Sequence, residues 1–80
     1  MKELVEFVVK SLVDNPDEVR VDAHGDHSET TLELSVAAAD MGRVIGTRGR
    51  VINSIRSLVQ VAAAKEGLRV NLEVLEADRD

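Results

Sequence analysis

The sequence predicts a two-layer α+β domain in which helices cover one face of a three-stranded sheet. Three short segments alternate apolar and polar residues, which is the period of a half-buried strand. Other segments place apolar residues three and four positions apart, which is the period of an amphipathic helix. Along the 80 residues these segments follow the order α-β-β-α-α-β. Strands with one apolar face need one covering layer, so this order predicts a single sheet with helices on one side.

The first helix is expected over residues 2–14. Its apolar stripe consists of Leu4, Val5, Val8 and Leu12. Phe7 and Val13 lie off this stripe, which predicts that the helix packs on two sides. The helix is expected to stop at Asn15 and Pro16, because a residue before proline is biased away from the helical conformation.

The three strands are expected over residues 19–23, 31–36 and 69–74. Their inward-facing residues are Val19, Val21 and Ala23, then Leu32, Leu34 and Val36, then Val70, Leu72 and Val74. A polar, turn-like segment over residues 24–29 separates the first two strands, which predicts a hairpin.

Two helices are expected between the second and third strands. Asp40 is predicted to cap a short helix that begins at Met41 and ends at Gly46. The next helix is expected to begin at or just after Gly49 and to end at Gly67. Its apolar face consists of Val51, Ile55, Leu58, Val59 and Ala62, flanked by Ile52 and Ala63, and its outer face includes Arg56 and Gln60.

Length and composition predict one domain over residues 1–80, with a frayed tail over 76–80. The chain has no cysteine, which excludes disulfides and thiolate metal sites. Phe7 is the only aromatic residue, which argues against binding of bases on an aromatic platform. Glu3 and Glu6 interrupt the apolar N-terminal stretch, which predicts that it is not a signal peptide, and no run approaches membrane-spanning length. We therefore expect a soluble, cytoplasmic protein without a membrane partner.

The charge of the chain is unevenly distributed. Its net charge of −5 argues against nonspecific, charge-driven binding of nucleic acid. Residues 1–39 hold nine acidic and three basic residues, whereas residues 41–57 hold four arginines and no acidic residue. The four arginines are Arg43, Arg48, Arg50 and Arg56. One basic segment in an acidic chain predicts a localised anion-binding site.

The segment Gly46-Thr47-Arg48-Gly49 lies inside this basic region, between two predicted helices. Glycine allows a sharp turn and a close approach of a sugar-phosphate strand. The amides at the start of the following helix, together with Arg48 and Arg50, suit phosphate oxygens. Arg43 is expected to reach the same strand. The candidates for an apolar groove that selects bases are Val44, Ile45 and Ile52.

Two glycines three residues apart are a weak signal alone, because glycine commonly ends helices. The nine residues 44–52, Val-Ile-Gly-Thr-Arg-Gly-Arg-Val-Ile, nevertheless resemble the KH signature. Segments 12–19, 40–46 and 62–67 resemble landmark segments of the small bacterial KhpA (YlqC) family. The resemblance spans essentially the whole chain and implies the type II KH fold.

By this resemblance, the chain is expected to bind single-stranded RNA, as an RNA chaperone or post-transcriptional regulator linked to cell elongation and envelope homeostasis. The resemblance also implies a homodimer, or a heterodimer with a larger KhpB-type (Jag/EloR) protein. Thr47 stands where family members usually carry lysine, and Asn53 where they often carry another, which predicts weaker phosphate contact at these two positions. Arg48 places a charge one residue along.

Three other functions are alternatives to RNA binding. His24 and His27 lie in an acidic turn, but such turns are usually only solvated, so no metal and no cofactor is expected. No nucleophile is paired with a base, which predicts that the chain is not an enzyme. The third alternative is a protein–protein assembly module with a weak or vestigial RNA loop. Its contact face, and a possible dimer face, would consist of Ser54, Ser57, Val61 and Ala64.

Overall fold

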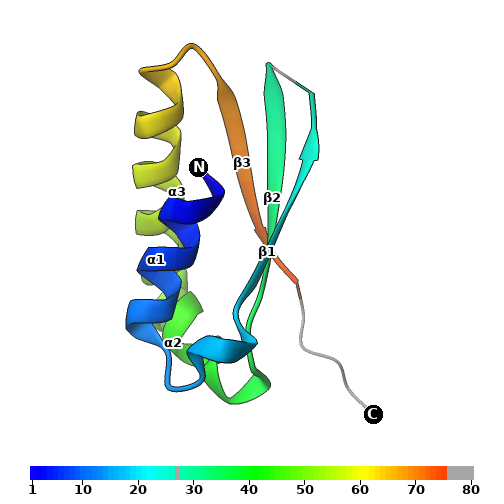
Figure 1. Cartoon of the computed structure of the whole chain (residues 1–80). Coiled ribbons are helices and arrows are strands. Elements are labelled where there is room, and N and C mark those ends of the chain that lie inside the picture. The colour runs from blue at the N-terminus through cyan, green and yellow to red at the C-terminus, as the bar shows by residue number, and fades with distance from the viewer. Residues whose placement is uncertain (27, 76–80) are drawn as a thin grey trace.

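The computed structural model describes residues 1–26 and 28–75, in the predicted order α-β-β-α-α-β (Figure 1). Its helices are α1 (Lys2–Leu12), α2 (Met41–Ile45) and α3 (Arg50–Ala64). Its strands are β1 (Arg20–Gly25), β2 (Glu29–Ser35) and β3 (Arg69–Val74). Each predicted element is present, with bounds that differ by at most a few residues. The predicted tail 76–80 and His27 lie outside the described residues.

The strands form one sheet in the order β1-β2-β3. β1 and β2 pair antiparallel, with Val21 opposite Leu34, so the predicted hairpin is confirmed. β2 and β3 pair parallel, with Leu32 opposite Leu72. A parallel pair cannot be joined by a tight turn. The two helices α2 and α3 supply the crossover, and the segment between them is therefore fixed at both ends by packed elements.

All three helices lie on one face of the sheet, which gives the predicted two-layer α+β arrangement (Figure 1). The core between the two layers is built from branched aliphatic side chains and one alanine. Its buried members are Val5, Val9, Val19, Val21, Leu32, Leu34, Val36, Val44, Ile52, Ile55, Val59, Ala63, Val70 and Leu72. No helix within residues 1–26 and 28–75 has the length and apolarity needed to cross a membrane.

The buried face of α1 differs from the predicted stripe. Val9 is fully buried beside Val5, whereas Leu12 is exposed. Phe7 is 72% exposed, so the prediction that α1 packs on two sides is wrong for this residue. The helix ends at Leu12, two residues earlier than predicted. Six apolar residues cover most of the circumference of α1, and the sequence pattern alone could not tell which of them face the sheet.

The buried face of α3 is likewise rotated from the predicted one. Ile52, Ile55, Val59 and Ala63 are its buried residues. Leu58, which was expected in the core, is 48% exposed. Arg56 does not simply face outward: its Nε donates a hydrogen bond to the Leu72 carbonyl at 3.0 Å. This bond ties α3 to β3, on the side of α3 opposite to Leu58.

Candidate nucleic-acid interface

The loop between α2 and α3 has a backbone that requires its glycines. Gly46 has φ 75° and ψ 173°, and Gly49 has φ 74° and ψ 15°. Both φ values lie in the region that side chains with a Cβ rarely adopt. The Gly49 N–H donates to the Gly46 carbonyl at 3.1 Å, which closes the turn, and α3 begins at the next residue.

Gly46 is also required by close packing. A Cβ at this position would lie 2.9 Å from both N and Cβ of Val51, and closer still to Val51 Cγ2. At Gly49 the nearest atoms to such a Cβ would be Asn53 Nδ2 at 3.6 Å and Ile52 Cγ2 at 3.9 Å. The first glycine therefore meets a steric and a conformational demand, and the second meets only a conformational one.

Arg48, between the two glycines, also has a left-handed backbone, with φ 57° and ψ 28°. It is the one residue other than glycine with a positive φ in the described part of the chain. For an L-residue this conformation costs about 1–2 kcal/mol. Such local strain is concentrated at functional sites, so it marks Arg48 as a candidate for a functional side chain.

The exposed side chains of this segment are those of Thr47, Arg48 and Arg50. Neither Arg48 nor Arg50 forms an ion pair with any residue in 1–26 or 28–75. Both stand at the N-terminal end of the fifteen-residue helix α3, where the helix dipole favours an anion. Two unpaired guanidinium groups and a helix N-terminus thus lie together around the loop.

The other two arginines of the basic segment have partners. Arg43 Nη2 lies 3.3 Å from Asp14 Oδ2. Arg56, besides its bond to Leu72, donates from Nη1 to Asn53 Oδ1 at 3.1 Å. The four arginines that are close in sequence are therefore not equivalent, and only the side chains of the two beside the loop form neither a hydrogen bond nor an ion pair with described residues.

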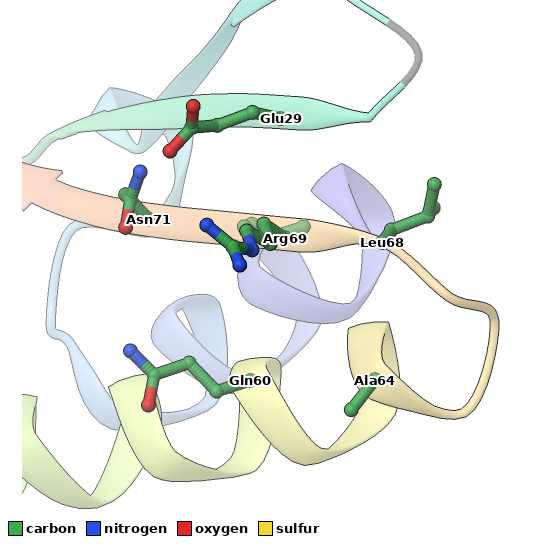
Figure 2. Close-up of a pocket in the computed structure, with 7 residues that line it drawn as sticks. Glu29, Gln60, Ala64, Leu68, Arg69 and Asn71 are labelled. Carbon is green, nitrogen blue, oxygen red and sulfur yellow. The ribbon is translucent and has the colours of Figure 1, made fainter.

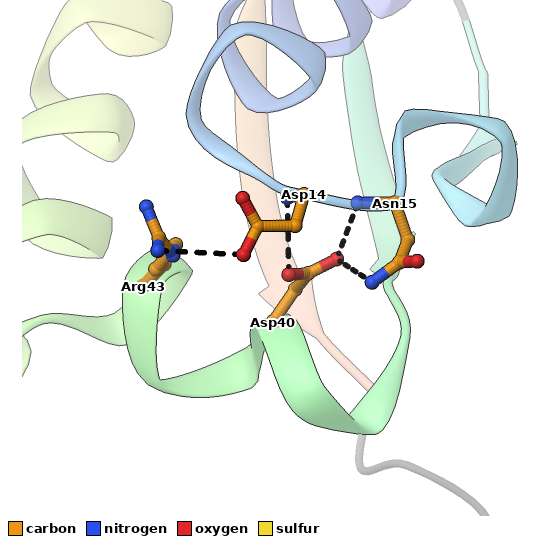
Figure 3. A network of polar contacts seen from close by, with 4 residues as sticks. All are labelled: Asp14, Asn15, Asp40 and Arg43. Atoms are coloured by element: carbon orange, nitrogen blue, oxygen red, sulfur yellow. Dashed lines mark hydrogen bonds and ion pairs between the residues drawn. The ribbon is translucent and has the colours of Figure 1, made fainter.

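Asp40 was predicted to cap α2 with its side chain, and this prediction is wrong. Asp40 stands at the cap position, but its side chain makes no capping hydrogen bond. Its carboxylate instead accepts the Asp14 N–H at 3.1 Å and, from Asn15, the backbone N–H at 3.0 Å and Nδ2 at 3.1 Å (Figure 3). The competing partners come from the turn after α1, about 25 residues away, so local sequence gave no sign of them.

The hydrogen bonds of Asp40 also set its protonation. Burial, with a side chain only 1% exposed, acts to raise the pKa of the Asp40 carboxyl. The hydrogen bonds from Asp14 and Asn15, together with the positive charge of Arg43, outweigh this effect, and the pKa of Asp40 lies below its ordinary value. Asp40 is therefore a carboxylate at neutral pH, anchored under the start of α2.

The three residues proposed for an apolar groove differ in accessibility. Val44 is 0% and Ile52 is 3% exposed, and both belong to the core. Only Ile45 is half-buried and accessible from the surface. Val44 and Ile52 follow the same pattern of branched apolar residues as Ile45, so the sequence could not separate a groove from the core beneath it.

The proposed dimer face lies on the solvent side of α3. Its four residues Ser54, Ser57, Val61 and Ala64 are all exposed, and Val61 is 60% exposed. Leu58, three residues before Val61, adds a second exposed apolar side chain to this face.

A hollow of about 360 Å³ lies at the other end of α3, between this helix and the start of β3 (Figure 2). The residues that line it are Glu29, Gln60, Ala64, Leu68, Arg69, Val70 and Asn71. Its rim is mostly polar and exposed. Ala64 is the only predicted site residue that lines it, so this hollow is not part of the loop site.

The acidic turn holds no metal cluster in the described residues. His24 Nε2 lies 2.9 Å from Glu33 Oε1 on the neighbouring strand. The carboxylate of Asp26 accepts hydrogen bonds from Ser28 and Glu29. These bonds account for both side chains within the hairpin itself.

Comparison with known proteins gives matches over nearly the whole chain. The family described as KhpA/KhpB, KH domain matches residues 2–74. The "RNA-binding protein KhpA" of Borreliella burgdorferi is 49% identical over 74 residues, which are 92% of this chain and 90% of that protein. The proteins of the same name from Caldanaerobacter subterraneus and Halalkalibacterium halodurans are 49% and 47% identical, over 94% and 95% of this chain and all of theirs. With its α-β-β-α-α-β order, the chain therefore belongs to the KhpA/KhpB family of type II KH domains, which is not a family of enzymes.

Proposed function

We propose that this chain binds single-stranded RNA through the loop over residues 46–49. The observation that carries the proposal is the geometry of the loop. Arg48 is exposed, has a left-handed backbone, and lies directly before α3 between two positions whose backbone angles favour glycine. In this proposal the side chains of Thr47, Arg48 and Arg50, together with the amides at the start of α3, bind phosphate oxygens of the RNA. Relatives of nearly the same length are named for RNA binding.

The remaining predicted residues receive different roles in this proposal. Gly46 and Gly49 let the RNA backbone approach the loop. Ile45 is the accessible apolar residue for contact with a base. Val44 and Ile52 support the loop from the core rather than touch RNA, because a side chain must reach the surface to contact a base. Such contacts with phosphate fix the position of RNA without reading its sequence.

The proposal is tested by titrating the protein into a labelled single-stranded RNA and into a duplex of the same sequence. We expect the single strand to bind more tightly, because KH loops hold about four unpaired nucleotides. A plot of log affinity against log salt should fall with a slope of about −0.7 for each phosphate contacted, giving a shallow slope for two or three contacts. Absence of binding, or preference for the duplex, would contradict the proposal.

The cellular role of RNA binding is a further part of the proposal. We propose that RNA binding serves an RNA chaperone or post-transcriptional regulator in the cytoplasm, linked to cell elongation and envelope homeostasis. This role comes from the resemblance of the sequence to the small KhpA proteins. A modest affinity is expected for one loop with few phosphate contacts, and a second subunit would raise it by bringing two loops to one RNA.

A second candidate function, assembly, is favoured by the exposed apolar residues of α3. Val61 and Leu58 are 60% and 48% exposed, next to the small side chains of Ser54 and Ser57. Small residues around an exposed valine allow another helix to approach closely. We propose this face as the contact of a homodimer, or of a heterodimer with a KhpB-type (Jag/EloR) protein.

A further inference from the structure

We infer that Asp14 limits the affinity of this chain for RNA by occupying Arg43, so that a phosphate must displace Asp14 before it can use this guanidinium. The inference rests on the proposed function of the loop. It concerns a single contact, between Arg43 Nη2 and Asp14 Oδ2 at 3.3 Å (Figure 3).

Arg43 stands in the last turn of α2, the helix that leads into the loop. It lies three residues before Gly46, which corresponds to a rise of about 4.5 Å along a helix. The Gly46 N–H donates to the Gly42 carbonyl at 2.9 Å, so α2 continues without a gap into the loop. The Arg43 side chain is 60% exposed, and an RNA phosphate can therefore reach it from solvent.

Asp14 is held in place by the turn after α1 rather than by its own side chain. Its N–H donates to Asp40 Oδ1 at 3.1 Å, and the two bonds from Asn15 to Oδ2 fix the following residue. Because the backbone is already anchored on a buried carboxylate, Asp14 loses little freedom when it pairs with Arg43. The Asp14 carboxylate is 71% exposed and is free to leave when a stronger anion arrives.

The charge balance around Arg43 sets the direction of the effect. One carboxylate pairs with Arg43 directly, and the charge of Arg43 also lowers the pKa of the second, Asp40. An RNA phosphate that approaches Arg43 therefore meets a paired carboxylate, whereas Arg48 and Arg50 form no ion pair with residues 1–26 or 28–75. Exposed ion pairs contribute little, so removing the competing carboxylate should change the affinity by about two- to fivefold rather than by orders of magnitude.

The test compares Asp14→Asn with Asp17→Asn, each with Arg43 present and with Arg43→Gln. Asp14→Asn keeps the size of the side chain and the backbone bond to Asp40. Asp17→Asn is the matched control, because it removes the same charge from an exposed residue of the next turn, which forms no ion pair with a described residue. The probe is a labelled single-stranded RNA of about ten nucleotides, long enough for the roughly four that a KH loop holds.

We expect Asp14→Asn to lower the dissociation constant about two- to fivefold beyond the effect of Asp17→Asn, and to steepen the salt dependence by about 0.7 in slope. Arg43→Gln should abolish this gain in the Asp14→Asn background and change little in the parent. Equal affinities of the Asp14→Asn and Asp17→Asn variants would overturn the inference while leaving the RNA-loop proposal standing. Weaker binding of Asp14→Asn would instead mean that Asp14 positions Arg43 for RNA. A parent protein that binds no RNA would overturn both.

Discussion

Gly46 lies directly against Val51, with no room for a side chain between the backbone at the end of α2 and the first turn of α3. A Cβ at Gly46 would approach the Val51 backbone N to 2.9 Å. The same glycine has a φ of 75°. Gly46 is therefore constrained both by its packing against Val51 and by its backbone conformation. These two constraints fix the position of the loop that carries Arg48.

Alanine substitutions should separate these two demands. Gly46→Ala is expected to lower the free energy of unfolding by more than about 2 kcal/mol, because it adds a clash with Val51 to an unfavourable φ. Gly49→Ala adds only the unfavourable φ and should lower it by about 1–2 kcal/mol. Urea unfolding of the two variants measures both values. If Gly46→Ala and Gly49→Ala lower the free energy of unfolding equally, Val51 moves aside at no energetic cost.

Arg48→Gly should improve stability and impair binding at once. Glycine adopts the left-handed conformation without a steric penalty, so the free energy of unfolding is expected to rise by up to about 1 kcal/mol after the entropic cost of glycine. The guanidinium is lost, so the affinity for single-stranded RNA should fall. Thermal melts and RNA titration check the two effects. If the variant is less stable than the parent, Arg48 is held by contacts that offset its backbone strain.

The sequence was informative where the period of apolar residues decides the structure. The alternation in 19–23, 31–36 and 69–74 correctly located three strands, and the residues around Gly46 correctly located the junction of two helices. It was less informative where a helix is apolar over most of its surface. On α1 the predicted buried face included Leu12 and not Val9, and on α3 it included Leu58. Both predictions are wrong because each helix has more apolar residues around its circumference than the sheet can cover.

The partners of two charged residues, Arg43 and Asp40, could not be predicted for a different reason. Arg43 belongs to a segment without acidic residues, and Asp14 is distant from it in sequence, yet the fold brings their side chains within 3.3 Å. Asp40 has the residue type and position of a helix cap, and no local signal reveals that its partners belong to the turn at Asp14 and Asn15. Pairings between distant segments depend on tertiary structure and could not be read from spacing.

The Asp40 network should make stability depend on pH in the acidic range. A carboxylate whose pKa is lower in the folded than in the unfolded state stabilises the fold above the unfolded pKa, and this stability is lost as pH falls through the folded pKa. The folded pKa of Asp40 lies below the ordinary value of an aspartate, so the loss is expected below about pH 4. Asp40→Asn should melt several degrees below the parent at pH 7, and the difference should narrow below pH 4.

The control for this experiment is Asp17→Asn, which alters an exposed carboxylate outside the network. It should melt close to the parent across the same pH range. A constant difference between the parent and Asp40→Asn from pH 7 to pH 3 would show that the charge of Asp40 does not contribute to stability.

Val61→Glu should dissociate a dimer that uses the outer face of α3. The side chain is 60% exposed, so the substitution should leave the fold intact, while a buried charge at the centre of a helix–helix contact is costly. Sedimentation velocity of the parent, Val61→Glu and the control Gln60→Glu measures the effect; Gln60 lies on the side of α3 that borders the hollow. A dimer that persists in Val61→Glu must use another surface.

The most direct test of the RNA-binding loop is the affinity of the double variant Thr47→Asp and Arg48→Asp for single-stranded RNA. Both side chains are exposed, and aspartate tolerates the left-handed conformation at position 48 better than most residues, so the variant should fold. Two carboxylates at the proposed phosphate site should weaken binding at least tenfold, with a melting temperature close to that of the parent. A folded double variant that binds RNA as tightly as the parent would contradict the assignment of RNA binding to this loop.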